Sequence, residues 1–178
     1  GSMMWRLWVV WLGVLLSGCA GVEVSHYAAQ QPALQLEQYF NGRVEAWGMF
    51  QKRNGEVVKR FQVQIDASWQ GERGILDESF VYSDGSKQRR VWQLTRVAQG
   101  RYVGRADDVE GDAVGEVSGN ALRWRYVLRL PVDGVEYRVD FDDWMYLIDR
   151  ETMVNRSVMS KFGVELGQVT LFFRRRPA

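Results

Sequence analysis

The run LRWRYVLRL, residues 122–130, is the most regular stretch of this 178-residue chain. Apolar or aromatic residues occupy every second position from Leu122 to Leu130, and arginines occupy three of the four positions between them. A period of two predicts a β-strand with one buried face and one solvent-facing face. Residues 135–142 alternate in the same way, with Glu136, Arg138 and Asp140 between apolar side chains. We therefore expect a sheet that is apolar on one face only, which is typical of antiparallel order.

Turn-forming dipeptides divide the rest of the chain into segments of the same kind. Asn54-Gly55, Asp84-Gly85 and Asp133-Gly134 supply the positive φ angles that tight hairpins need. No long helical period separates the segments, which excludes β-α-β units. Strands are expected near residues 43–51, 57–69, 74–82, 88–97, 101–106, 113–118, 121–130, 135–148, 152–161 and 166–175.

Short strands joined by hairpins close most economically into an up-and-down barrel, because closure removes exposed sheet edges. The sequence predicts an all-β, antiparallel, lipocalin-like barrel of about 8–10 strands, which has room for one small ligand. A two-sheet sandwich is the alternative that the pattern leaves open. The alternation is lost over residues 144–148, which predicts either a bulge or burial on both faces.

A short helix is expected in front of the barrel. Pro32 suits a first helical turn, and Leu36, Tyr39 and Phe40 share one face before Asn41-Gly42 ends the helix. This apolar face must cover something, and the open end of the barrel is the best candidate.

The N-terminal end has the pattern of a secretory signal. An apolar run from Leu7 to Leu16 follows Arg6, and the small residues Ser17-Gly18 lead to Cys19, the one cysteine of the chain. The run is too short for a membrane-spanning helix, which needs roughly 20 apolar residues. It resembles a bacterial lipoprotein signal, in which the cysteine is lipidated and becomes the first mature residue. The alternative is an ordinary cysteine in a discarded signal peptide.

The expected domain organisation follows from this signal. Residues 1–18 are a signal peptide that includes the cloning scar Gly1-Ser2, residues 19–31 are the lipidated cysteine and a flexible polar tether, and residues 32–178 are one β-barrel domain. By analogy with known lipoproteins, Ala20 after the cysteine implies sorting to the outer membrane. The expected location is therefore the cell envelope, lipid-anchored at the periplasmic face of the outer membrane.

Composition excludes several classes of function. The chain has 23 basic and 22 acidic side chains, and removal of residues 1–18 takes away only Arg6, which leaves 22 against 22. A nucleic-acid partner is not expected, since such binding needs a basic surface. The single His26 lies in the tether, so no serine or cysteine triad can form. Asp107–Asp112 is acidic but lacks the glycine and glutamate of a calcium loop, so no metal or cofactor is expected.

Aromatic side chains and one aspartate are the remaining candidates for a site. Rings in alternating strands fill a core or line an apolar pocket, and the pattern does not separate the two. Asp143 is expected to point inward with Phe141, and Asp142 outward. A buried carboxylate is costly unless paired, so Asp143 is either a polar anchor in a pocket or the partner of Arg90 or Arg96. The candidate ligand-binding residues are Trp92, Trp124, Tyr126, Tyr137, Phe141, Asp143 and Trp144.

Several motifs together resemble a known family. They are Tyr39-Phe40-Asn41-Gly42, Ala46-Trp47-Gly48, Arg90-Val91-Trp92, Gly119-Asn120-Ala121-Leu122 and Asp142-Asp143-Trp144-Met145. They resemble an uncharacterised bacterial lipoprotein family, domain-of-unknown-function family 3833, over nearly the whole mature chain. The resemblance implies a Gram-negative envelope protein, adds no catalytic residue, and hints at lipid because its genes often neighbour enzymes of fatty-acid modification. The helix, glycine and Trp47 are also similar to the start of a lipocalin (calycin) barrel, which implies that Trp47 packs at one end.

These observations favour a lipid-anchored binding module that holds or carries a fatty acid or other apolar ligand, linked to membrane-lipid modification. The alternative is a structural or assembly lipoprotein with a filled barrel and a protein partner. An enzyme that acts on lipids through Asp143 and a neighbour is the least favoured. The binding hypothesis requires a cavity beside Trp124, Tyr126 and Asp143.

Overall fold

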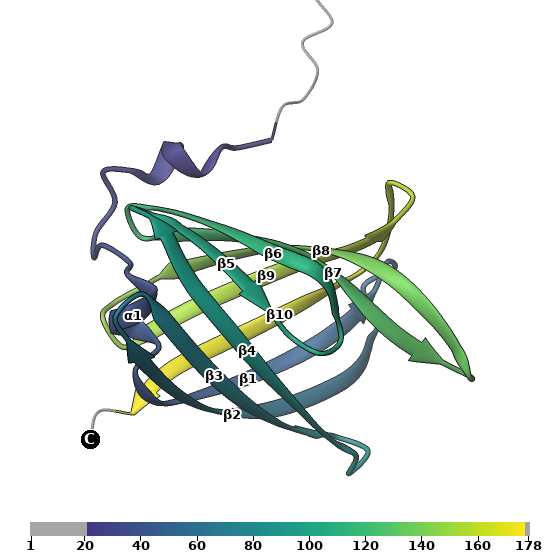
Figure 1. Ribbon diagram of the computed structural model, residues 1–178. Helices are drawn as coiled ribbons and strands as arrows, with labels where there is room; N and C mark the ends of the chain where they lie inside the picture. The colour runs from purple at the N-terminus through teal and green to yellow at the C-terminus, as the bar shows by residue number, and fades with distance from the viewer. Residues whose placement is uncertain (1–20, 177–178) are drawn as a thin grey trace, which may run out of the picture.

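Ten antiparallel strands form a closed barrel in the computed structural model, which describes residues 21–176 (Figure 1). Each strand pairs with its neighbours in sequence, and β10 returns to pair with β1 from Arg43↔Arg176 to Lys52↔Gly167. This closure confirms the predicted up-and-down barrel and excludes the sandwich. The strands are β1 (Gly42–Lys52), β2 (Val57–Gln70), β3 (Arg73–Tyr82), β4 (Lys87–Ala98), β5 (Arg101–Arg105), β6 (Val109–Ser118), β7 (Ala121–Val132), β8 (Val135–Leu147), β9 (Thr152–Lys161) and β10 (Val164–Arg176). The predicted signal peptide and Cys19 lie outside the described residues.

The β7–β8 hairpin shows why the strand boundaries follow the turn signals. Asp133 and Gly134 both have positive φ, 49° and 78°, as a two-residue hairpin turn requires. The two strands then pair without a register shift from Val132↔Val135 to Ala121↔Tyr146. The regular pairing keeps every second residue of β7 on the inner face, as the alternation predicts.

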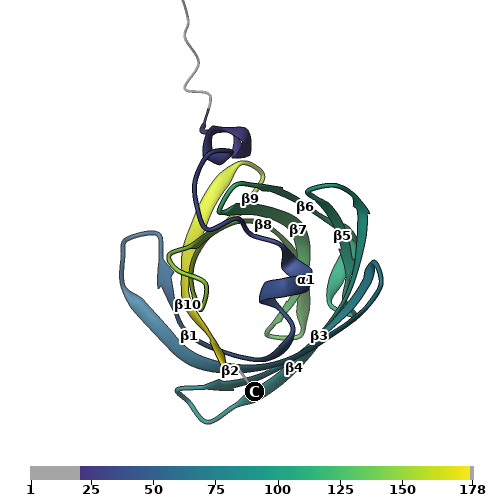
Figure 2. The same cartoon turned by 90° about the vertical axis from the view of Figure 1, so that its left-hand side faces the viewer.

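The helix α1 (Leu36–Tyr39) closes one end of the barrel. It begins four residues after Pro32, so the predicted start is wrong, because Pro32 belongs to the connecting segment. The predicted role is correct: α1 lies within the ring of strands when the barrel is viewed from its end (Figure 2), and Leu36 and Phe40 are 2% and 4% exposed. Within residues 21–176, no helix has the length and apolar character needed to cross a membrane.

A tryptophan secures this closed end, but it is not Trp47. Val44 and Ala46 point inward, so alternation places Trp47 on the outer surface, where its ring lies 6.2 Å from that of Phe172. The predicted end-packing of Trp47 is therefore wrong. Trp69 takes that position and donates a hydrogen bond from Nε1 to the Phe40 carbonyl, at 2.8 Å.

The N-terminal segment is ordered against the outside of the barrel. The 3₁₀ helix η1 (Val24–Tyr27) brings the Tyr27 ring to 6.0 Å from Trp144 and 5.4 Å from Tyr146. This packing differs from the flexible tether that the composition predicts for residues 21–31. It also explains the lost alternation, since the outer face of β8 is covered here while its pairing with β9 stays in register. The outer face is half-buried at Trp144 and Tyr146 and exposed at Ile148, so burial on both faces is correct only in part, and the predicted bulge is wrong.

Candidate functional site

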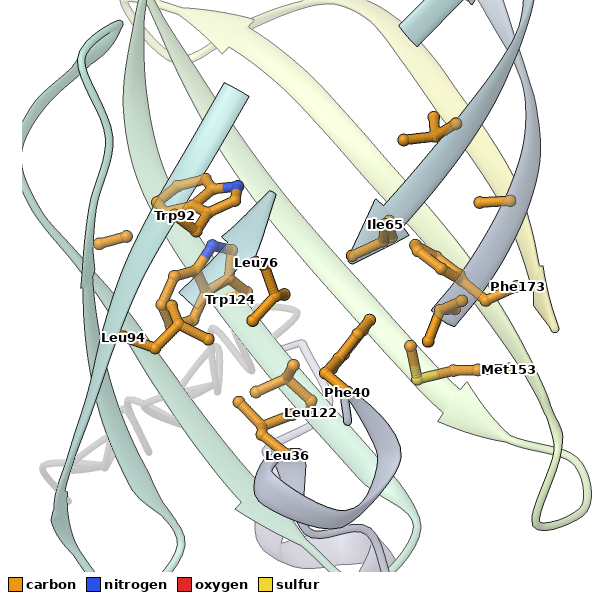
Figure 3. Packing of buried hydrophobic residues seen from close by; sticks show 14 of the residues in the cluster. Leu36, Phe40, Ile65, Leu76, Trp92, Leu94, Leu122, Trp124, Met153 and Phe173 are labelled. Carbon is orange, nitrogen blue, oxygen red and sulfur yellow. The ribbon is translucent and has the colours of Figure 1, made fainter. Parts of the chain in front are cut away.

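The barrel interior is not filled. It contains a cavity of about 800 Å³ whose floor is formed by Leu36 and Phe40 of the α1 end. In Figure 3 the Leu36 side chain lies directly below Leu122, and Phe40 lies beside Leu122 on the side of Met153 and Phe173. Side chains from the opposite end of the strands, such as Tyr82 and Leu130, line the cavity as well, so it extends from the α1 floor to the hairpin end.

Aromatic side chains form one wall of this cavity. The Trp92 ring meets Trp124 edge-on at 5.4 Å and Tyr126 edge-on at 5.3 Å, and Tyr126 stacks on Phe141 at 5.0 Å. Edge-to-face and offset-stacked pairs are the favoured arrangements of aromatic rings. The contacts hold the rings in one arrangement, so the cavity has a preformed apolar wall.

Two glycines make room for Trp124. A Cβ atom added at Gly104 would lie 2.6 Å from Cζ2 of Trp124, and one added at Gly115 would lie 2.5 Å from Cε3. Strands β5 and β6 therefore contribute no side chain at this level, and the indole lies against their backbone. Glycine within a strand is a sign of such close approach.

Gly115→Ala is expected to lower the free energy of unfolding by about 1–3 kcal/mol, because the new methyl group overlaps an indole held by Trp92. Urea unfolding of the wild type and the variant measures the change. In a Trp124→Leu background the same substitution should cost little, since the obstructing ring is gone. An equal loss in both backgrounds would show that Trp124 is not the obstacle.

A polar cluster faces the aromatic wall from β3 and β4. Glu78 lies opposite Arg90 in the strand pairing. Arg90 binds Asp108 with both ends of its guanidinium, from Nε to Oδ1 at 3.0 Å and from Nη2 to Oδ2 at 2.8 Å. Burial raises the pKa of Glu78 to about 7, and Arg90 offsets that rise only in part.

Asp143 is the second acid that lines the cavity, and it is buried. Its residue is 6% exposed, and within the described part of the chain its Oδ1 atom has no hydrogen-bond partner. Burial raises the pKa of Asp143 to about 7, against the lowering effect of the Ser157 hydroxyl. Asp142 points outward and binds Arg123 at 2.8 Å. The inward and outward positions of the two aspartates are thus as predicted.

The expected ion pair of Asp143 is wrong. Arg90 is already bound to Asp108, and Arg96 lies 3.7 Å from Glu37 near the α1 end. Asp108 of the acidic segment thus binds an arginine that lines the cavity. Among residues 21–176, no group of three His, Cys, Asp or Glu side chains is placed to hold a metal ion.

A sequence profile of proteins of unknown function, DUF3833, matches residues 13–175. The chain belongs to the DUF3833 family. The family resemblance read from the motifs is confirmed, and it brings no known activity. No curated protein matches the sequence of this DUF3833 chain.

Solved structures with a similar barrel include two that match this DUF3833 chain with TM-scores above 0.5. One is a protein of unknown function of the DUF3598 family from Nostoc punctiforme PCC 73102, with a TM-score of 0.57 and 12% identity over 88% of this chain and 53% of that chain. This chain thus spans about half the length of that protein. The other is the S-type phycobiliprotein lyase CPES from Guillardia theta, with a TM-score of 0.54 and 8% identity over 82% of this chain and 95% of that chain. At such identities the likeness shows the fold alone.

The structure of the DUF3833 barrel brings five of the seven predicted site residues to one cavity, namely Trp92, Trp124, Tyr126, Phe141 and Asp143. Tyr137 is 42% exposed near the β7–β8 hairpin tip and is not among the residues that line the cavity. Trp144 follows the inward Asp143 and therefore points outward, where it lies under the Arg123 guanidinium. Neither belongs to the candidate site.

Sequence reasoning missed Glu78, the partner in register of Arg90. Its position between Leu76 and Phe80, both of which are buried, was the available signal, because alternation places all three on one face.

Proposed function

We propose that this protein binds or carries a small apolar ligand, such as a fatty acid, a derivative of one or another apolar molecule, inside the barrel. The observation that supports it is the cavity of about 800 Å³ between the α1 floor and the hairpin end. Ligand sites of this size are mostly apolar, with a few polar groups that orient the ligand. The aromatic wall and the two acids that line the cavity, Glu78 and Asp143, fit that description.

The cavity favours binding over the alternative of an assembly lipoprotein, since that role was expected to have a filled barrel. A filled interior would have placed Trp124, Tyr126 and Asp143 in close contact with the opposite strands. All three line open volume instead.

The proposed location rests on the sequence of the N-terminal end. Lipidation of Cys19 would anchor the protein at the periplasmic face of the outer membrane, where the cargo would be a membrane lipid or a product of its modification. Because η1 packs on the barrel from Val24 onward, only a few residues would separate the lipid from the barrel surface.

A cavity-filling variant tests the proposed binding. Val169→Trp on β10 introduces a ring at a position that lines the cavity, whereas Thr170→Trp introduces the same ring at the adjacent, outward-facing position. The chain from residue 19, with Cys19→Ser, is expressed in its bacterial host and analysed by native mass spectrometry. A co-purifying apolar molecule is expected with the wild type and Thr170→Trp, and at least tenfold less with Val169→Trp.

The same proteins are then titrated with 1-aminoanthracene, a neutral fluorescent probe. Binding that is lost only in Val169→Trp supports the proposal. Apo protein that does not bind the probe, or probe binding that both tryptophan variants retain, would contradict a ligand site in the barrel.

A further inference from the structure

We propose that the polar groups Glu78, Arg90, Asp108 and Asp143 of the cavity select an apolar ligand whose polar end donates hydrogen bonds, such as a hydroxyl, amide or amine, over one that ends in an ionised carboxylate. The inference rests on the proposed function, because it concerns the chemistry of the ligand held in the same cavity.

The charge balance at this level of the cavity is acidic. Glu78, Asp108 and Asp143 face it with three carboxyl groups, and Arg90 is the cation bound to one of them. The Arg90 guanidinium is already held by Asp108 through hydrogen bonds of 2.8 and 3.0 Å. An incoming carboxylate would therefore meet two further acids and a cation that is already neutralised, and like charges at short range are unfavourable.

An unused acceptor points to the same ligand chemistry. Within the described residues, Oδ1 of Asp143 has no hydrogen-bond partner, and only 6% of the residue is exposed. A buried acceptor left without a donor is unfavourable, because it has lost its hydrogen bonds to water. A hydroxyl, amide or ammonium group placed between Asp143 and Glu78 would satisfy this oxygen, whereas a carboxylate has no proton to give.

The other cations that line the cavity, Lys59, Lys87 and Arg129, lie toward the hairpin end, and Arg129 adjoins the cluster because its backbone N–H donates to the Asp108 carbonyl. Lys59 lies 3.6 Å from Asp84 of the β3–β4 hairpin, and Lys87 is exposed at the start of β4. Arg129 donates a hydrogen bond to the Asp107 carbonyl. A fatty acid would have to leave its carboxylate at the hairpin end and place hydrocarbon against Glu78 and Asp143. Oδ1 of Asp143 would then remain without a hydrogen-bond donor.

Three ligands of equal chain length test the selection: 1-decanol, decylamine and decanoate. Each ligand is added to the Cys19→Ser protein (residues 19–178) with bound 1-aminoanthracene, and displacement of the probe is measured. The pH is 8, so that decanoate is ionised. We expect the Kd of decanol and of decylamine to be at least tenfold lower than that of decanoate. Asp143→Leu should remove most of this preference, while Asp142→Asn, at the neighbouring outward position, should leave it unchanged.

The outcomes separate this inference from the proposed function. If decanoate binds as tightly as decanol and decylamine, and Val169→Trp abolishes that binding, the proposed selection is overturned while ligand binding in the barrel stands. A preference that persists in both Asp143→Leu and Glu78→Gln would also overturn it, since the cluster would then not be its source. Displacement by none of the three ligands, together with no binding of the probe, would contradict the proposed function itself.

Discussion

Phe40→Ala is expected to lower the free energy of unfolding by about 3–5 kcal/mol, the usual cost of removing a buried aromatic ring from a core. Phe40 is 4% exposed, and its ring meets those of Tyr39 at 5.0 Å and Phe173 at 6.0 Å. These contacts join the α1 end to β10. The loss of the ring would also enlarge the cavity at its floor. The neighbouring side chains could not fill this space, so the full cost of the lost contacts is expected.

Urea unfolding followed by tryptophan fluorescence measures this loss. Phe162→Ala is the matched control, because Phe162 lies in the β9–β10 turn and is 89% exposed. It should change the free energy of unfolding by no more than about 0.5 kcal/mol. If Phe40→Ala were as mild as this control, α1 would not be an integral part of the barrel core.

The stability of the protein is expected to fall as the pH rises from 5 to 8. Burial raises the pKa of Asp143 to about 7 in the folded chain, against about 4 for an unfolded aspartate. The folded state therefore binds the proton more tightly, so this stabilisation is fully present below the unfolded pKa and is lost as the pH rises through the folded one. Glu78 acts in the same direction, with a pKa raised to about 7 by burial.

Asp143→Asn should remove the contribution of this group, since its amide does not ionise. At pH 8 the variant is expected to be about 2–4 kcal/mol more stable than the wild type, and at pH 4 the two should be nearly equal. Urea unfolding at several pH values gives both curves. Asp142→Asn is the control, because Asp142 lies outside and pairs with Arg123, and its pH dependence between 5 and 8 should match the wild type. Parallel curves for Asp143→Asn and wild type would show that Asp143 stays ionised in the fold.

A protein that keeps an unpaired acid inside its barrel forgoes stability that an asparagine would supply. Such departures from good packing rules are typical of functional sites, where the missing partner is often the ligand. The expected gain from Asp143→Asn and the expected loss of ligand preference from Asp143→Leu are therefore two consequences of the same unsatisfied oxygen.

The strands, their turns and the inward face of each were predictable because they depend on local backbone geometry. A period of two sends Asp143 inward and Asp142 outward whatever the rest of the chain does, and Asp133-Gly134 forms a hairpin turn for its own φ angles. The site residues Trp124, Tyr126 and Phe141 followed from the same rule.

The remaining features depend on which distant strands meet. Inward residues become neighbours according to strand number, tilt and stagger, and the alternation carries none of these quantities. For that reason the partner of Arg90 proved to be Asp108 rather than Asp143, and the end-packing tryptophan proved to be Trp69 rather than Trp47. The same quantities determine the width of the barrel, so only the closed ten-strand structure could show that its aromatic side chains surround a cavity instead of filling it.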